Sequence, residues 1–452
     1  MLELVIMKQP ELPPDKSLLF KAQPQEIIKL MEDKSLNTRL QEIDEDYPYW
    51  DRFKRKVKDI EQDPVLLWAY NKTLRERSVA KMLISNIPGF EFKYNTSNRI
   101  LRFLHNFDLH IGGVLEGRAI IPPDDRTRYL ISSIMEEAIA SSQLEGAATT
   151  REIAKQMLRS NRKPKTLDEK MILNNYLTIR RVLEIKDQKF SKELILELHS
   201  IISKDTLKDP ENEGKFRSNN EVNVVDGLTG EIFYTPPDFK NIDQLMDELC
   251  LFANHIDEVA FIHPIIKGII LHFLIGYIHP FVDGNGRTAR AIFYWYLISR
   301  GYWLVEYMSI SKIIIRAPVK YARAYLYTEH DENDLTYFID YNLKSMDLAL
   351  TNLQSYIQRK VTEKKSLFYF IQQKNVNERQ AEILKGLLMD DAKGYTIKET
   401  QSKFGISYQT ARTDLMGLQS LGYVRESKIS GKKLMFFKED GFENKLKDFL
   451  KH

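Results

Sequence analysis

The sequence predicts a mainly α-helical protein with one β-hairpin near its middle and a small module of three helices and a hairpin at its C-terminus. Apolar residues recur at helical spacing along most of the chain. Segment 221–237 differs, because two β-prone runs flank a Gly-rich turn. From about residue 377 the helical segments become short. A length of 452 residues suggests two to four domains.

The composition is that of a soluble globular protein, with 43% hydrophobic residues, 29% charged residues and a formal net charge of +3. The whole molecule is therefore not a polycation that coats nucleic acid. Cys250 is the single cysteine, which excludes an intramolecular disulfide and a cysteine-based metal cluster. The longest apolar stretch, near 265–278, is short and interrupted by polar residues, so no membrane contact is expected. A cytoplasmic location fits these features.

The chain is expected to begin with a helical region over 1–110, whose role is open. Pro122-Pro123-Asp124-Asp125 supplies a helix start for an amphipathic helix over 126–146 that stops at Gly146. The hairpin of 221–237 is the one clear extended segment. The other expected helices cover 51–60, 66–81, 168–183, 191–202, 241–256, 264–277, 287–300 and 335–359.

The C-terminal module, 377–452, shows three short helical segments followed by strand, turn and strand. This is the order of a winged helix-turn-helix domain. The last 92 residues hold 17 Lys and Arg against 12 Asp and Glu. One interpretation is binding of double-stranded DNA through 377–440, with Arg412 in a recognition helix and a basic wing on the phosphates. The wing lysines would be Lys428, Lys432 and Lys433. The other interpretation is a protein-docking or dimerisation unit.

Segment 279–290 carries the strongest chemical signal. Gly284 and Gly286 permit a tight loop whose backbone N–H groups turn inward, and a helix follows at once. Such a loop and helix start form a cradle for anions. Arg287 and Arg290 are three residues apart on that helix, so both guanidinium groups could contact one phosphate chain.

Two further residues of this segment supply what phosphoryl chemistry needs. Asp283 offers a hard oxygen ligand that suits Mg²⁺ beside phosphate oxygens. His279 stands at the loop entrance, where a neutral imidazole could accept a proton from an attacking hydroxyl. Positioning, charge neutralisation, a metal and a base are thus all present.

Segment 279–290, His-Pro-Phe-Val-Asp-Gly-Asn-Gly-Arg-Thr-Ala-Arg, resembles the Fic family signature His-Pro-Phe-x-Asp/Glu-Gly-Asn-Gly-Arg-x-x-Arg at every fixed position. A helix beginning His263-Pro264 and a hairpin ending Tyr234-Thr235-Pro236-Pro237 are also placed as in that family. The resemblance covers about 111–346 and implies a helical Fic fold with the hairpin as a flap. A linking helix, 347–376, would join it to the winged helix.

The resemblance implies transfer of AMP from MgATP to a Tyr, Thr or Ser hydroxyl of a target protein or of the chain itself. His279 would be the base, and Asp283 would hold Mg²⁺. The flap would pin the target by strand addition. Tyr321 is either a wall of the adenine site or a core residue. The implied phosphate contacts are Gly284, Asn285, Gly286, Arg287 and Arg290, and the implied flap residues are Ile232, Phe233, Tyr234 and Thr235.

A second motif, Ser141-x-x-x-Glu145-Gly146, is similar to the inhibitory pattern of Fic enzymes that carry the inhibitor in their own chain. Glu145 would pair with Arg290 and keep it from the γ-phosphate; the alternative is an exposed carboxylate at a helix end. Two other functions stay open. One is AMP removal with Glu145 activating water, and the other is a DNA-binding regulator whose Fic domain senses nucleotide. A homo-oligomer is possible.

Overall fold

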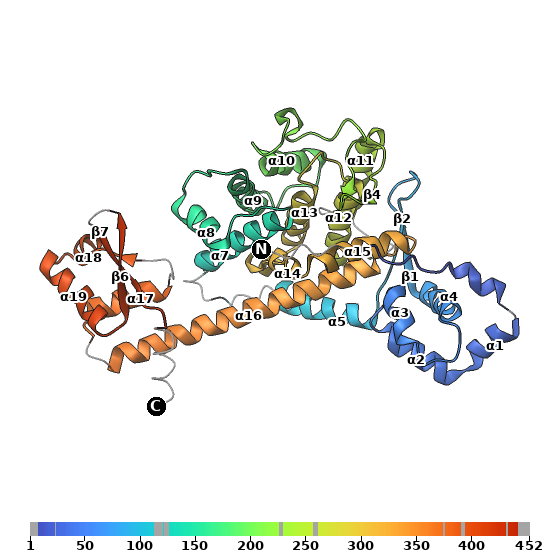
Figure 1. Ribbon diagram of the computed structural model, residues 1–452, viewed down its shortest axis with the longest axis horizontal. Coiled ribbons are helices and arrows are strands. Elements are labelled where there is room, and N and C mark those ends of the chain that lie inside the picture. Colours follow the sequence, from blue (N-terminus) through green and yellow to red (C-terminus); the bar gives the residue numbers. More distant parts are fainter. Residues whose placement is uncertain are drawn as a thin grey trace. The chain divides into compact units, whose positions relative to one another are not determined.

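The computed structural model describes residues 8–22, 24–112, 121, 126–225, 229–255, 261–373, 376–389, 394–430 and 433–441 (Figure 1). Two units emerge, Met1–Thr351 and Asn352–His452, and each is considered by itself. Helix α16 (Thr336–Gln373) runs from the first unit into the second. In the described ranges, no helix is long and apolar enough to cross a membrane.

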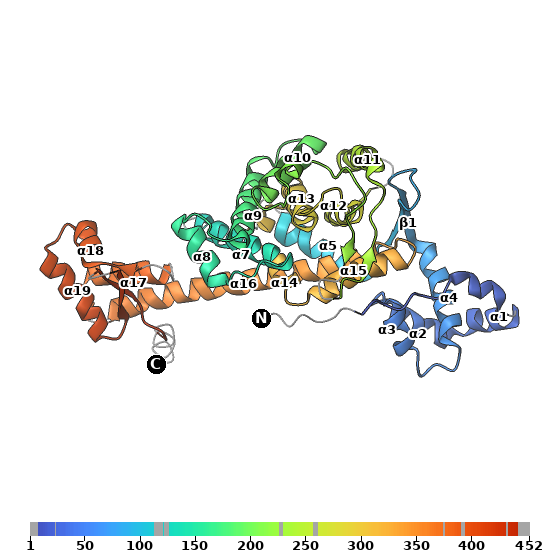
Figure 2. The same ribbon diagram turned by 45° about the horizontal axis from the view of Figure 1, so that its top comes forward.

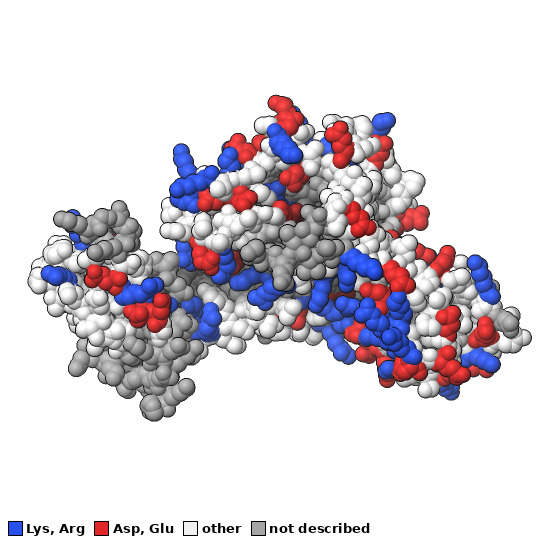
Figure 3. Space-filling view, in the orientation of Figure 1, with Lys and Arg blue, Asp and Glu red and all other residues white. Residues whose placement is uncertain are grey.

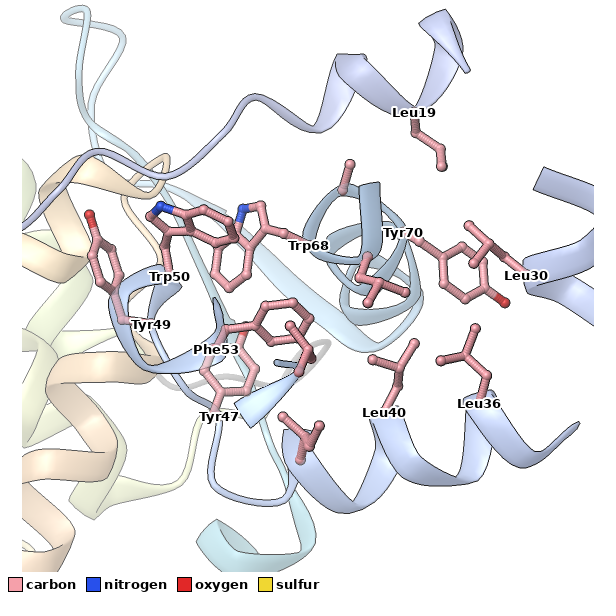
Figure 4. Packing of buried hydrophobic residues seen from close by; sticks show 14 of the residues in the cluster. Leu19, Leu30, Leu36, Leu40, Tyr47, Tyr49, Trp50, Phe53, Trp68 and Tyr70 are labelled. Atoms are coloured by element: carbon pink, nitrogen blue, oxygen red, sulfur yellow. The ribbon is translucent and has the colours of Figure 1, made fainter. Parts of the chain in front are cut away.

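The N-terminal helices pack around an aromatic core. Trp68 lies at its centre, with the rings of Trp50 and Phe53 5.7 and 5.2 Å away at steep angles. Figure 4 shows that Leu36 and Leu40 reach the same cluster from the neighbouring helix. The elements are η1 (Lys16–Lys21), α1 (Pro24–Glu32), α2 (Lys34–Asp44), α3 (Trp50–Lys56) and α4 (Pro64–Arg75).

The expectation of a helix over 66–81 is wrong at its C-terminal end. Helix α4 stops at Arg75, and β1 (Val79–Leu83) pairs antiparallel with β2 (Glu91–Asn95). Segment 221–237 is therefore not the one extended segment. The β1–β2 hairpin is stabilised by long-range packing, since the ring of Phe92 on β2 lies 5.9 Å from that of Phe273 on the later helix α12 (Pro264–Ile278). Helical periodicity within a short window cannot register such a contact.

Helix α13 (Asn285–Ser299) is the centre of the remaining part of the first unit. It packs on α12 (Pro264–Ile278), α9 (Leu167–Glu184), α10 (Lys192–Ser203) and α7 (Arg126–Leu144), which surround it in both ribbon views (Figures 1 and 2). Nearly all side chains of α12 and α13 are buried, as their apolar sequences require. The surrounding helices are α5 (Asn98–Phe107), α7 (Arg126–Leu144), α8 (Arg151–Ser160), α9 (Leu167–Glu184), α10 (Lys192–Ser203), α11 (Ile242–Asn254), α14 (Ser311–Ile314) and α15 (Pro318–His330).

Most expected helices agree with these bounds to within about four residues, but α16 continues to Gln373, well beyond the expected end at 359. Two other differences are informative. Helix α13 begins at Asn285, two residues before the expected start, so Asn285 and Gly286 belong to its first turn. Helices α8 and α15 were not expected. The Pro-rich helix start at 122–125 and the flap turn at 226–228 lie outside the described residues.

The second unit contains α17 (Glu378–Met389), β5 (Gly394–Tyr395), α18 (Ile397–Phe404), α19 (Tyr408–Ser420), β6 (Val424–Ser430) and β7 (Lys433–Lys438). Its sheet has the order β5-β7-β6 with antiparallel pairing. Strand β5 was missing from the sequence-based expectation because two residues are too few to show alternation. Thr396 and Glu399 form a capping box that starts α18. Lys432 and the side chains of Lys428 and Lys433 lie outside the described residues.

Charge is mixed on the part of the N-terminal helices that Figure 3 displays, where acidic and basic side chains alternate. Ion pairs in the N-terminal part of the chain include Lys56 with Asp46 and Arg99 with Asp46. This face therefore carries no continuous field of one sign.

Candidate active site

The loop between α12 and α13 starts from a strained residue. His279 caps the C-terminus of α12 in the left-handed conformation, with φ 50° and ψ 57°, and its N–H donates to Ile275 O at 3.0 Å. For a residue with a Cβ this conformation costs about 1–2 kcal/mol. The surrounding contacts must therefore hold His279 in place.

The loop is closed from within by Asn285. Its Oδ1 accepts from Phe281 N at 2.9 Å, and its Nδ2 donates to Phe281 O at 2.8 Å. The side-chain amide of Asn285 is thus used to close the loop. Phe281 is fully buried and its ring stacks on His199 at 3.7 Å. This packing anchors the loop in the core.

His199 supports the loop from α10. Its Nδ1 accepts from Gly214 N at 3.1 Å, so its Nε2–H donates to Asp283 O at 2.9 Å. Burial lowers the pKa of His199 to about 4. The imidazole is therefore neutral near pH 7 and keeps this pair of hydrogen bonds.

The start of α13 offers donors for an anion. Gly284, at φ 82°, caps the helix without a side-chain bond, so the first N–H groups have no acceptor within the helix. Arg287 is 1% exposed, and among the described residues its Nε and Nη2 have no hydrogen-bond partner, although Nη2 lies 3.7 Å from Asp283 Oδ2. Burial lowers the pKa of this guanidinium. A buried cation with two unused donors beside a free helix start is suited to an anionic ligand.

Arg290 is held by α7. Its Nη2 lies 2.7 Å from Glu145 Oε1 and 3.0 Å from Ser141 O, and its Nε donates to Ser141 Oγ at 2.8 Å. A Cβ on Gly286 would lie 2.2 Å from Glu145 Oε1. The carboxylate therefore lies directly against the first turn of α13, among the donors described above. Burial would raise the pKa of Glu145, but Arg290 and other cations outweigh it and the net shift is downward.

The imidazole of His279 faces the same region. Its Nδ1 lies 3.1 Å from Gly276 O, so Nδ1 carries the proton in the neutral form and Nε2 keeps a lone pair. Burial lowers the pKa of His279, and Arg217 adds to this effect while Glu145 opposes it. His279 is therefore predominantly neutral near pH 7, the state a general base requires.

Asp283 is the candidate metal ligand. Its side chain is 61% exposed, and Oδ1 accepts from Gly284 N at 2.6 Å. Over the described residues there is no group of three or more His, Cys, Asp or Glu side chains that could hold a metal ion. The Asp283 carboxylate therefore fits a cation that takes one ligand from the protein and the others from water and phosphate, as Mg²⁺ commonly does.

The flap consists of β3 (Val224–Val225) and β4 (Ile232–Tyr234), paired antiparallel with a register shift in β3. The Tyr234 ring lies 5.0 Å from that of Tyr277 on α12, which fixes β4 to the helix that leads to His279. Ile232 and Thr235 are exposed and Phe233 is half-buried. Within the described chain, this hairpin offers the strand expected to dock a target.

Tyr321 lies on α15 among other aromatic residues. Its hydroxyl is 2.8 Å from His272 Nε2, and its ring is 5.4 Å from that of Tyr325. Burial and the charge of Arg290 lower the pKa of His272 to about 3, so this imidazole is neutral. His272 therefore acts as a packed hydrogen-bond partner, and contact of Tyr321 with adenine stays a prediction.

Sequence reasoning missed three residues of this site. Arg217 hydrogen-bonds the loop at His279 O, and His199 supports it at Asp283 O. Glu137 anchors α7, since its Oε2 accepts from Ser311 N at 3.0 Å and from Ser309 Oγ at 3.1 Å. Of the three, only Glu137 could have been found from the sequence, because it lies four residues before Ser141 and so on the same helix face as the Ser141-x-x-x-Glu145 motif.

Part of the chain is similar to known proteins. Residues 189–297 match the sequence model of the Fic/DOC family. Protein adenylyltransferase Fic of Drosophila erecta is 32% identical over 108 residues, which cover 24% of this chain and 20% of that protein. The protein of the same name from Drosophila ananassae is 31% identical over 130 residues, covering 29% and 22%. The matched part spans about a fifth of the length of these curated relatives.

Among solved structures, a Fic family protein from Desulfovibrio desulfuricans G20 is similar with a TM-score of 0.46 and 18% sequence identity. The alignment covers 75% of this chain and 97% of that one.

Proposed function

We propose that this chain, which contains a Fic/DOC domain, is a protein adenylyltransferase that transfers AMP from MgATP to a Tyr, Thr or Ser hydroxyl of a target protein or of itself. One observation carries the proposal. The buried guanidinium of Arg287, two of whose nitrogens have no hydrogen-bond partner among the described residues, lies beside the start of α13, and His279 lies at the entrance of the same loop. The names of the relatives support the same reaction.

In this mechanism the target oxygen attacks the α-phosphorus of ATP while its proton passes to Nε2 of His279. The bond between the α-phosphorus and the bridging oxygen breaks, and pyrophosphate leaves. The N–H groups of Asn285 and Gly286 would hold phosphate oxygens, with Arg287 on the β-phosphate. Mg²⁺, held by Asp283, would neutralise charge on the phosphates.

The flap would place the target. An extended segment that adds to the exposed edge of the β3–β4 hairpin would form main-chain hydrogen bonds. Recognition would then depend on backbone geometry more than on side chains, so a hydroxyl-bearing loop of varied sequence could serve. The exposure of Ile232 and Thr235 supports this role.

The proposed resting state is inhibited. Glu145 binds Arg290, so this guanidinium is not free for the γ-phosphate, and the carboxylate lies among the donors that should receive phosphate oxygens. Nucleotide bound beside it would be displaced from the in-line geometry. A displacement of about 1 Å can lower a rate by about 10²-fold.

The test is to incubate the purified full chain and its Glu145→Gly variant with ATP labelled at the α-phosphate, in a lysate of the host cell. Covalent label in protein, dependent on His279, is the expected result. Nucleotide binding without labelling by either protein would refute the transferase and favour a nucleotide-sensing regulator. Loss of label from AMP-modified protein on adding wild type, but not Glu145→Gly, would favour AMP removal.

A second function is proposed for the C-terminal unit, namely binding of double-stranded DNA by a winged helix. The order α17-β5-α18-α19-β6-β7 with sheet order β5-β7-β6 supports it. One face of α19 packs into the core, whereas Tyr408, Gln409, Arg412 and Thr413 on the other face are exposed. Such side chains can reach base edges and phosphates in a major groove.

Binding of the full chain to a fluorescent DNA duplex of mixed sequence tests this second function. Affinity should fall steeply as salt rises, because bound Lys and Arg displace counterions from phosphates. No binding to any duplex, or binding indifferent to salt, would favour the protein-docking alternative.

A further inference from the structure

Arg217 is a buried cation that the proposed reaction does not use. It follows η5 (Pro210–Asn212) in the segment between α10 and the flap, and 3% of its surface is exposed. The ion pairs found among the described residues do not include it. Burial lowers the pKa of its guanidinium. A charge kept in the interior without a carboxylate at contact distance is costly, so its hydrogen bonds must account for its presence.

One set of these bonds holds the start of the catalytic loop. Arg217 Nε donates to His279 O at 3.0 Å, and Arg217 N donates to Pro280 O at 2.8 Å. His279 is in the left-handed conformation, and a change in its ψ angle would turn its carbonyl away from Arg217. Arg217 thus resists the rotation that would relax His279 and reorient its imidazole.

The other set holds both ends of the flap. Arg217 Nη1 donates to Asn219 O at 2.8 Å and to Asn220 Oδ1 at 3.1 Å, just before β3. Its Nη2 donates to Pro237 O, just after β4. Asn220 Oδ1 also accepts from Phe239 N at 2.8 Å, which closes the base of the hairpin. The planar guanidinium of Arg217 therefore connects the two ends of the flap with the backbone carbonyl of His279, the proposed general base.

We infer that Arg217 is a positioning residue that couples target docking on the flap to the orientation of His279. The inference rests on the proposed function, because it assigns a task to that same site. A target strand added to the flap fixes the backbone at Asn219 and Pro237. The rigid guanidinium passes this restraint to His279 O. A lysine keeps the charge but cannot point donors at three segments at once.

The first experiment uses Glu145→Gly protein as the parent, so that inhibition does not hide the effect. Self-labelling with α-labelled ATP and binding of ATP are measured for the parent, Arg217→Lys and the control Lys215→Gln. The Lys215 side chain is 64% exposed and pairs only with Glu211 among described residues. Arg217→Lys should lower kcat about 10–10²-fold, because a small misplacement of the base is enough. The dissociation constant for ATP should change less than about twofold, since Arg217 makes no bond to Arg287 or Arg290. The control should match the parent.

The second experiment observes the base directly. Imidazole NMR signals are recorded on histidine-labelled full chain, with His279 assigned through His279→Ala. Arg217→Lys should shift or broaden the His279 signal and leave that of His199 in place. Ile232→Gly, which loosens the exposed flap strand, should also shift the His279 signal when Arg217 is present. In the Arg217→Lys background it should add no further shift.

The outcomes are distinguishable. An unchanged His279 signal and unchanged kcat in a folded Arg217→Lys protein would overturn the inference. So would a weaker ATP affinity together with a lower melting temperature, since that combination marks a general structural role. If the Glu145→Gly parent transfers no AMP, the proposed function fails, while the NMR comparison still decides whether Arg217 orients His279.

Discussion

Replacement of Glu145 by glycine should activate AMP transfer and tighten ATP binding together. The change removes the carboxylate that lies 2.7 Å from Arg290 Nη2 and against Gly286. Arg290 keeps its bonds to Ser141 and so stays oriented toward the loop. Its Nη2 donor, and the space at the start of α13, become available to the γ-phosphate.

The size of the effect follows from these contacts. A hydrogen bond to a charged group contributes about 1.5–3 kcal/mol. Transfer of that bond from Glu145 to a phosphate oxygen should strengthen ATP binding by about 10–150-fold. Restoring the in-line geometry of the α-phosphate should raise the rate of AMP transfer about 10²-fold. The Arg290 side chain is 4% exposed and loses its carboxylate partner, so the change should also cost the fold about 3 kcal/mol.

The assay compares incorporation of α-labelled ATP by wild type, Glu145→Gly, Glu145→Gln and Arg290→Ala at matched concentrations. Glutamine removes the charge but can still accept from Arg290, so its activity should lie between the first two. Arg290→Ala breaks the same pair and also loses the γ-phosphate contact, so it should stay inactive. Equal labelling by wild type and folded, ATP-binding Glu145→Gly would refute the inhibitory role of Glu145.

Four further results are expected. His279→Ala should lower AMP transfer by about 10²–10⁴-fold with ATP binding retained, because a general base contributes that much; rate and binding assays check it. Asp283→Ala should lose transfer and regain part of it at raised Mg²⁺ or Mn²⁺ in the same assay. Arg412→Ala should weaken duplex binding and reduce its salt dependence with unchanged AMP transfer. Burial raises the pKa of Glu329 to about 8. The folded protein prefers the neutral carboxyl, whereas the unfolded chain ionises it above its ordinary pKa of 4.5. The contribution of Glu329 to the free energy of unfolding is therefore fully present below pH 4.5 and is lost as the pH rises through 8. The melting temperature of Glu329→Gln should therefore rise relative to that of wild type as the pH goes from 5 to 9.

Contrary outcomes are equally concrete. Unchanged labelling by His279→Ala would exclude this base, and the absence of metal rescue would remove Asp283 as a cation ligand. An Arg412→Ala variant that binds duplex as wild type does would place the interface elsewhere. A constant difference in melting temperature across pH would show that Glu329 does not change its protonation between those limits.

The loop and its helices were predictable because their determinants are close together in the sequence. Gly284, Asn285 and Arg287 follow one another, and a tight loop before a helix constrains all three. The pairing of Glu145 with Arg290 was also expected, although 145 residues separate them, because the motif around Ser141 was identifiable by its spacing. That expectation came from the resemblance to a known family, whereas composition and periodicity gave no distance between α7 and α13.

The missed features depend on contacts that no short window contains. His199 and Arg217 act on carbonyls of the loop, and any residue can supply a carbonyl, so the sequence holds no partner to search for. Strand β1 was mistaken for the end of a helix since its pairing with β2 and the packing of Phe92 on Phe273 are long-range. Tertiary contacts outweighed local propensity at that point.

The two attachments of α7 differ in their response to ionic strength. The Glu145–Arg290 pair includes a partly exposed carboxylate, which mobile ions can screen. Glu137 is 2% exposed and bonds to the neutral groups of Ser309 and Ser311, which salt does not affect in this way. Rising salt therefore weakens the contact of Glu145 with Arg290 more than the hydrogen bonds of Glu137. The attachment at Glu145, just after the end of α7, is thus easier for salt to release than the attachment at Glu137.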